Sequence, residues 1–286
     1  MSDYRIINHF YQYNQKKLVQ DIMNMYYKQD FCIINYIYGA ILVNQDLVGR
    51  WKTYNNVSMQ QVFEDSDFLL PDGAAIRTMY AIGRLFNRRN WPTTLYNLNG
   101  TDFLPYFLDM ITHQWIHINL ITLTVYDSNP DHHNPQGALK KNINKYITNR
   151  RPIMRQYNVE VEYNDNNYTW FDRSWIQAFL ESNTKTSWSI NILLNFRWWW
   201  GRWIPHQELF AYLNKESIKK HKILCMNQGA TVDFWIGKET RAPKRIRRLR
   251  LESLYRVVTD PQKNRTKFRV SFKVIGLIIS KIILKG

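Results

Sequence analysis

The chain has few of the features that mark secreted or membrane-spanning proteins. It contains two cysteines, Cys32 and Cys225, among 286 residues. Neither belongs to a Cys-x-x-Cys pair, so we expect neither a disulfide framework nor a cysteine-based zinc site. Both lie in apolar runs, where a free cysteine behaves as a small buried hydrophobe. The first residues are polar and contain no apolar signal core, which favours a reducing cytoplasm.

Long hydrophobic runs are also missing, because none approaches the roughly 20 residues that a membrane-spanning helix needs. The nearest candidate, residues 274–284, is interrupted by Ser280 and Lys281. This segment is typical of a helix that lies in a membrane interface with its lysines towards lipid phosphates. A terminal helix or strand packed on the core is equally compatible with the pattern.

Acidic residues are scarce compared with basic ones. The sequence has 23 Asp and Glu against 39 Lys and Arg, a formal net charge of +16. Such an excess predicts an anionic partner: nucleic acid, a phosphorylated substrate or an anionic membrane surface. About half of the excess lies between Lys238 and Arg269. We therefore expect residues 241–286 to form a basic appendage, distinct in function from a domain over residues 1–240.

Aromatic residues are abundant and partly interleaved with arginine. Residues 197–203 read RWWWGRW, which suits stacking on bases or sugars, a membrane-interface belt, or an exposed loop folded over the domain. No RNA- or DNA-binding motif accompanies them, so nucleic acid is supported by composition alone, and we do not expect it as the partner.

Helix-like and strand-like segments alternate along the chain, which predicts a layered α/β domain without internal repeats. Helices are expected over residues 15–28, 60–64, 73–86, 103–115, 137–148 and 206–220. Strands are expected within 31–43 and over 68–70, 116–126, 189–196 and 222–226.

Asp72 is the acidic residue with the most informative position. It follows a short apolar run and precedes a predicted helix, and open α/β sheets bind ligands outside the carboxyl ends of their strands. Gly73 permits close backbone approach, and the helix start behind it attracts anions. Gly229 occupies a similar position after a later strand. A simple helix-capping role for Asp72 is the alternative.

A metal site is not expected. His113 and His117 have the i, i+4 spacing that places two imidazoles on one helix face, as in zinc proteases. The glutamate of that motif is replaced by Gln114, and no third ligand can be assigned.

Four segments carry a family resemblance: LLPDGAAI (69–76), NGTDF (99–103), PHQE (205–208) and GATVDFWIGKETRAPKRIRRLRLESLYRVVTDPQKNR (229–265). Their order and approximate spacing resemble those of the WecG/TagA/CpsF glycosyltransferases, glycosyltransferase family 26. The resemblance covers most of residues 15–268. It implies a Rossmann-like α/β fold with flanking helices and a basic C-terminal helical appendage.

The resemblance also implies an activity. The enzyme would be cytoplasmic, peripherally bound to the inner face of the cell membrane, inverting, and independent of metals and cofactors. It would transfer a hexose or N-acetylhexosamine, such as N-acetylmannosamine, its uronic acid or glucose, from a nucleotide-diphosphate sugar to a polyprenyl-diphosphate-linked saccharide. A homo-oligomer is compatible with this assignment. The competing hypothesis is a non-catalytic basic module that binds nucleic acid or anionic membrane.

Site residues follow from the same resemblance. Asp72 matches the proposed general base, a role that requires hydrogen-bond reach of the attacking hydroxyl. Gln207 and Glu208 match an element expected near the donor sugar, and Asn97 stands where the family usually has arginine. The expected substrate-binding set is completed by Gly73, Gly100, Thr101, Asp102 and Gly229. Contacts to diphosphate or membrane are expected from Arg241, Arg247, Arg248, Arg250 and Arg256.

Overall fold

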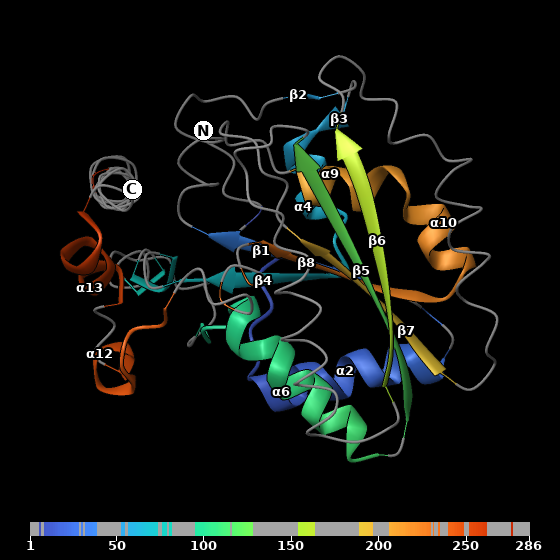
Figure 1. The fold of residues 1–286 in the computed structure, drawn as a ribbon, viewed down its shortest axis with the longest axis horizontal. Coiled ribbons are helices and arrows are strands. Elements are labelled where there is room, and N and C mark those ends of the chain that lie inside the picture. The colour runs from blue at the N-terminus through green and yellow to red at the C-terminus, as the bar shows by residue number, and fades with distance from the viewer. Residues whose placement is uncertain are drawn as a thin grey trace.

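The protein has an α/β fold in which helices cover both faces of one sheet (Figure 1). The computed structural model describes residues 6, 9–28, 30, 32–38, 53–54, 57–73, 76–78, 80–81, 95–114, 116–127, 154–163, 189–196, 206–229, 231, 234, 240–248, 252–261 and 276.

The sheet has six strands, and every pairing in it is parallel. Tyr38 pairs with Asp72 at the carboxyl end of the two strands at one edge. This arrangement confirms the predicted Rossmann-like α/β class, in which ligands bind beyond the strand ends. In spatial order the strands are β4 (Phe68–Asp72), β1 (Ile33–Tyr38), β8 (Ile223–Gly229), β7 (Ser189–Phe196), β5 (His117–Asp127) and β6 (Met154–Tyr163). A separate two-stranded ribbon consists of β2 (Thr53–Tyr54) and β3 (Val57–Ser58).

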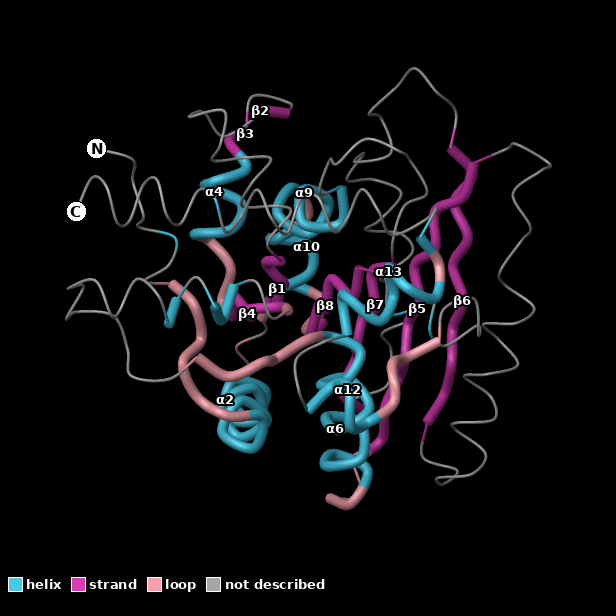
Figure 2. The backbone as a smooth tube through the Cα atoms, turned by 90° about the vertical axis from the view of Figure 1, so that its left-hand side faces the viewer, coloured by secondary structure: helices cyan, strands magenta, loops and turns pink. Residues whose placement is uncertain are grey.

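The helices fall into three groups. Figure 2 shows α2 (Gln15–Tyr27) and α6 (Gly100–Thr112) on one face of the sheet, with α4 (Met59–Glu64), α9 (His206–Leu213) and α10 (Lys215–Lys220) on the other. The C-terminal helices α12 (Lys244–Arg248) and α13 (Glu252–Thr259) lie beyond the ends towards which β1 and β4 point (Figure 1). The described part of the predicted basic appendage thus contains two helices.

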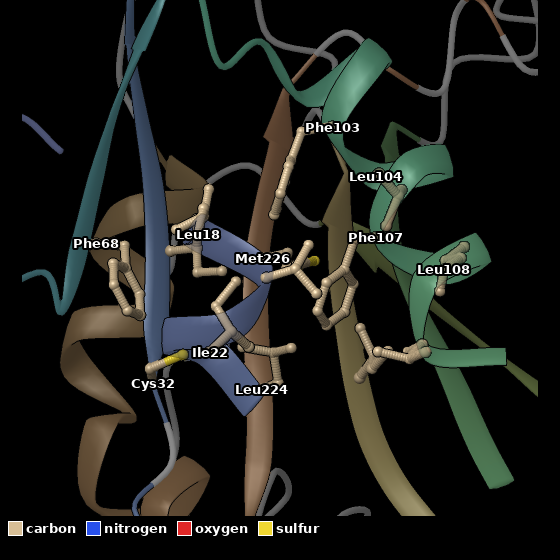
Figure 3. Packing of buried hydrophobic residues seen from close by; sticks show 14 of the residues in the cluster. Leu18, Ile22, Cys32, Phe68, Phe103, Leu104, Phe107, Leu108, Leu224 and Met226 are labelled. Atoms are coloured by element: carbon tan, nitrogen blue, oxygen red, sulfur yellow. The ribbon is translucent and has the colours of Figure 1, made fainter. Parts of the chain in front are cut away.

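The main core lies between the sheet and the pair α2 and α6. Helix α2 buries Leu18, Val19, Ile22 and Met23, a spacing that places apolar side chains on one face. These side chains and those of α6 pack against Leu224 and other residues of the sheet (Figure 3). Each buried side chain of this size contributes about 1.5–3 kcal/mol. The core thereby holds α6 firmly against the strands whose ends form the site described below.

Buried amides fix the register on the opposite face. Asn227 donates to the Oδ1 atom of Asn35, and Asn119 donates to Asn191 at 2.9 Å. Asn35 in turn donates to the Ser66 hydroxyl at 2.7 Å. A one-residue slip of a strand would turn these amides to the other face and leave their polar groups unpaired.

Most expected elements are confirmed, with boundary shifts of a few residues. The expected strand at 189–196 is β7, and the described residues within 73–86 include helical positions at 76–78 and 80–81. The helix predicted over 206–220 is two helices, because the chain leaves helical geometry at Asn214, whose side chain donates to the Phe210 carbonyl at 2.9 Å. Strand β6 was not predicted. The predicted helix at 137–148 lies outside the described residues.

The i, i+4 spacing of His113 and His117 does not fall on one helix. His113 caps the C-terminus of α6 and His117 begins β5, so the two imidazoles do not share a helix face. Cys32 and Cys225 are free and buried, as expected.

Candidate functional site

The candidate site lies at the carboxyl end of β4. Asp72 is the last residue of this strand and is half-buried. Gly73 follows with a φ of 91°, a left-handed conformation that favours glycine. Its N–H donates to the Asn97 Oδ1 atom at 3.2 Å, and the Leu98 N–H donates to the Pro71 carbonyl at 3.2 Å. These bonds tie the segment before α6 to the end of β4.

The start of α6 therefore lies beside Asp72. Asn99 caps this helix, because its Oδ1 atom accepts from the Asp102 N–H at 2.9 Å. The Asn99 amide also donates to the Asp102 carboxylate at 2.9 Å. A carboxylate in the first turn is stabilised by the helix dipole. Asp102 is thus held in place at the helix start.

Arginines of the C-terminal segment converge on this helix start. Arg241 approaches the Asp102 carboxylate at 2.8 Å, and Arg247 approaches the same group at 3.4 Å. Glu252 continues the network, since its Oε1 atom lies 3.4 Å from the Arg241 Nε and 2.9 Å from Arg256. The appendage is therefore attached to the sheet domain by paired charges.

An aromatic ring supports the same arginines. The guanidinium carbons of Arg241 and Arg256 lie 5.3 Å and 4.9 Å from the centre of the Phe234 ring. Cation–π contacts of this kind hold planar guanidinium groups in a defined orientation. Phe234 and Glu252 both belong to the 229–265 segment that carries the family resemblance, but the motif alone predicts no role for either.

Asp72 lies within reach of these charges. Its pKa is raised to about 6 because burial desolvates the carboxylate. Arg241 and Arg256 oppose this effect, whereas Glu252 and Asp102 add to it. The carboxylate is ionised at neutral pH but binds a proton more readily than an ordinary aspartate does. These are the properties required of a general base.

Tyr36 and Gln228 were not predicted as site residues. The Gln228 amide donates to the Tyr36 hydroxyl at 3.3 Å, and both side chains are buried. Desolvation raises the pKa of Tyr36, and the Asp72 charge adds to this shift. The feature that could have identified Tyr36 as a site residue is its position, because it lies near the end of β1, the strand adjacent to that of Asp72.

Gln207 and Glu208 lie in the first turn of α9, which covers the opposite face of the sheet from α6 (Figure 2). Both are buried. Desolvation raises the pKa of Glu208 to about 7, and its charge raises the pKa of the Cys225 thiol, which is itself raised mainly by burial. Their predicted position near the donor sugar stays a prediction, because the contacts of the described residues do not join them to the Asp72 cluster.

The structure thus brings most of the predicted residues together. The residues that gather between the end of β4 and the start of α6 are Asp72, Gly73, Asn97, Gly100, Asp102, Arg241, Arg247 and Arg256. Thr101 belongs to the first turn of α6 as well. Gly229 is the last residue of β8, so it lies at the same carboxyl end of the parallel strands as Asp72. The described part of the chain does not include Arg250, the Arg248 side chain or residues 197–203. Of the 274–284 segment it includes only Gly276.

Two further observations apply to the described residues. Within the described residues, no group of three or more His, Cys, Asp or Glu side chains could hold a metal ion. The same residues include no helix that is both long and apolar enough to cross a membrane.

Comparison with known families adds one match. The Glycosyl transferase WecG/TagA/CpsF family matches residues 199–285. The resemblance predicted from the motifs is therefore confirmed over this segment, which contains Gln207, Glu208 and all of the predicted arginines. The motifs around Asp72 and Asp102 lie outside it. The match implies a glycosyltransferase of cell-surface polysaccharide synthesis. None of the curated proteins matches the chain.

Proposed function

We propose that this protein transfers a hexosyl or N-acetylhexosaminyl group from a nucleotide-diphosphate sugar to a polyprenyl-diphosphate-linked saccharide. The observation that carries the proposal is the position of Asp72. Asp72 is the last residue of β4 and lies beside the start of α6. Its carboxyl group has a pKa of about 6, and arginines of the family-matched segment lie within electrostatic reach of it.

Asp72 would act as the general base. It would accept the proton of the acceptor hydroxyl while that oxygen forms a bond to the anomeric carbon. The nucleoside diphosphate would leave with the electron pair of the bond that breaks. A single displacement of this kind inverts the anomeric configuration. A raised pKa suits the role, because a base works best when its pKa lies near the working pH.

The arginine network would stabilise the diphosphate. Negative charge develops on the leaving group, and preorganised cations stabilise it more effectively than water does. Arg241, Arg247 and Arg256 are already held by Asp102, Glu252 and the Phe234 ring. The buried Nε of Arg247 has no hydrogen-bond partner among the described residues. A diphosphate oxygen would satisfy this donor.

The appendage would also bind the membrane that carries the acceptor. Helix α13 exposes Leu254 and Val258, which are 45% and 73% exposed and lie one turn apart. Basic residues precede them in α12. Apolar side chains beside cations favour the surface of an anionic bilayer. Peripheral association with the inner face of the cell membrane is therefore part of the proposal.

A screen tests the proposed function. The full chain is incubated with UDP- and GDP-sugars and with prenyl-diphosphate-linked acceptors in the presence of anionic lipid. Products are analysed by mass spectrometry, and the anomeric configuration by NMR. The proposal predicts one sugar residue added with inversion. Absence of transfer across the screen, together with tight binding to lipid or nucleic acid, would favour the non-catalytic basic module.

A further inference from the structure

A buried tyrosine lies beside the candidate base on the neighbouring strand. Tyr36 pairs in register with Leu70, and Tyr38 pairs with Asp72, so Asp72 lies two residues further along the adjacent strand. Tyr36 and Leu70 belong to the same core cluster on the α6 face, and alternation puts Asp72 on this face too. A diagonal pair two residues apart is within reach of an aromatic side chain.

The Gln228 side chain is fixed at both ends of its amide. Its Nε2 atom donates to the Tyr36 hydroxyl at 3.3 Å, and its Oε1 atom accepts from the Thr231 hydroxyl at 3.3 Å. Gln228 is 4% exposed and Thr231 is 2% exposed. A Cβ at Gly100 would lie 2.6 Å from the Gln228 Oε1 atom, so α6 closes over the amide only because this residue is glycine.

This arrangement sets the direction of the tyrosine proton. The Gln228 N–H occupies one side of the phenol oxygen, so the O–H must point away from it. No acceptor among the described residues, Asp72 included, is in hydrogen-bond contact with this proton in the structure, so a bond to Asp72 requires a movement of that side chain. The charge of Asp72 reaches the phenol, and together with burial it keeps the phenol protonated by raising the Tyr36 pKa.

We propose that Tyr36 is a positioning residue for Asp72: its O–H, oriented by Gln228, donates to one carboxylate oxygen and leaves the other free for substrate. The role deepens the proposed function and rests on it. Tyr36 keeps its proton during the reaction. The proton of the acceptor hydroxyl passes to the free Asp72 oxygen as the bond to the anomeric carbon forms and the nucleoside diphosphate departs.

Other charged groups also face Asp72. Arg241 and Arg256 from the C-terminal segment favour the carboxylate, while Glu252 and Asp102 disfavour it. A Tyr36→Phe substitution leaves all four in place and removes a neutral group, which is both the proposed donor to Asp72 and the acceptor of the Gln228 amide. Because a hydrogen bond to the charged form lowers the pKa of an acid, its loss raises the pKa of Asp72.

The experiment measures the protonation of Asp72 directly. The full chain is labelled with ¹³C at aspartate carboxyls and titrated by NMR as wild type, Tyr36→Phe and Gln228→Leu. Asp72→Asn identifies the resonance by its disappearance. Tyr27→Phe, at an exposed position of α2, is the matched control. We expect the Asp72 pKa to rise by about one unit in Tyr36→Phe, and to rise in Gln228→Leu as well.

Kinetics provide the second readout. The acid limb of the kcat/KM profile should move to higher pH by the same amount in both variants, lowering kcat/KM about fivefold at pH 6 and less than twofold at pH 9. A Tyr27→Phe profile should match the wild type. If wild-type protein shows no transfer, the proposed function fails, while the titration still decides the Tyr36–Asp72 interaction.

An unchanged Asp72 titration in either folded variant would overturn the proposal. Circular dichroism and thermal melting establish folding before either comparison. If Tyr36→Phe does not fold, Gln228→Leu decides the question, because it retains the phenol while removing its orienting donor and the acceptor of the Thr231 hydroxyl.

Discussion

The Arg241 guanidinium lies 2.8 Å from the Asp102 carboxylate, although 139 residues separate them in the chain. Arg241 precedes α12, and Asp102 lies in the first turn of α6. The same arginine favours the charged form of Asp72. Arg241 thus links the C-terminal segment to the start of α6 and also acts on the candidate base Asp72.

Arg241→Gln should weaken donor binding and alter the pH dependence of transfer. Loss of a charge-assisted hydrogen bond, worth about 1.5–3 kcal/mol, predicts a rise in donor KM of about tenfold or more. Loss of the cation raises the pKa of Asp72 above about 6, so the acid limb of kcat/KM moves to higher pH.

Arg245→Gln is the matched control, because Arg245 is an exposed cation of the adjacent helix α12. Its kinetics should equal those of the wild type within about twofold, as expected for an exposed charge. Equal effects of the two substitutions would show that only the total positive charge matters.

Glu208→Gln should stabilise the protein at high pH. Folding raises the Glu208 pKa from 4.5 to about 7, so the folded state holds a proton that the unfolded state has released. This group's favourable contribution is complete below pH 4.5 and is lost as the pH rises to about 7. The substitution should raise the free energy of unfolding by at most about 3 kcal/mol at pH 8 and by little at pH 4.5.

Urea unfolding at the two pH values checks this prediction. A gain that does not depend on pH would contradict the assignment of a protonated buried carboxyl. Transfer assays on the same variant test whether Glu208 also binds the donor: unchanged kinetics would limit its role to the buried packing of α9.

Gly100→Ala should destabilise the start of α6. The added Cβ would lie 2.6 Å from Gln228 Oε1, so either the helix or the amide must move, at a cost of about 1–3 kcal/mol. Gly276→Ala is the control, because a Cβ there meets no atom within 4 Å. Thermal unfolding should show a lower Tm for the first variant alone. Equal Tm values would mean that Gln228 is not held against Gly100.

Leu254→Ser combined with Val258→Ser should weaken membrane binding. Each exposed apolar side chain of α13 would lose about 1.5–3 kcal/mol of burial in the bilayer, which predicts at least a tenfold fall in vesicle affinity. Sedimentation with phosphatidylglycerol vesicles measures it, and the exposed Tyr27→Ser variant is the control. Unchanged sedimentation would exclude α13 as the docking helix.

Much of the fold follows from local patterns. The apolar spacing of α2 and the Ile- and Leu-rich composition of β7 indicate their structures directly, because a buried helix face repeats at about 3.6 residues and a central parallel strand is rich in such residues. Strand β6 was missed because MRQYNVEVEY contains polar residues at many positions, as an edge strand can. The break at Asn214 depends on one side-chain bond to Phe210.

The site was predictable only in part. Asp72, Gly73 and Asp102 are marked by their place at the end of a strand or the start of a helix. Tyr36 and Gln228 resemble ordinary strand residues until the strand order places β1 beside β4. The pairing of Arg241 with Asp102 is a long-range contact, and no spacing rule along the chain reveals it.

The central claim is that Asp72 acts as the base in sugar transfer. The most direct measurement compares product formation by wild type, Asp72→Asn and the control Asp65→Asn, an exposed carboxyl at the C-terminus of α4. Mass spectrometry follows addition of one sugar to a prenyl-diphosphate-linked acceptor at pH 8. We expect a loss of about 10²–10⁴ in kcat for Asp72→Asn and none for Asp65→Asn. Transfer by folded Asp72→Asn at the wild-type rate would contradict this claim.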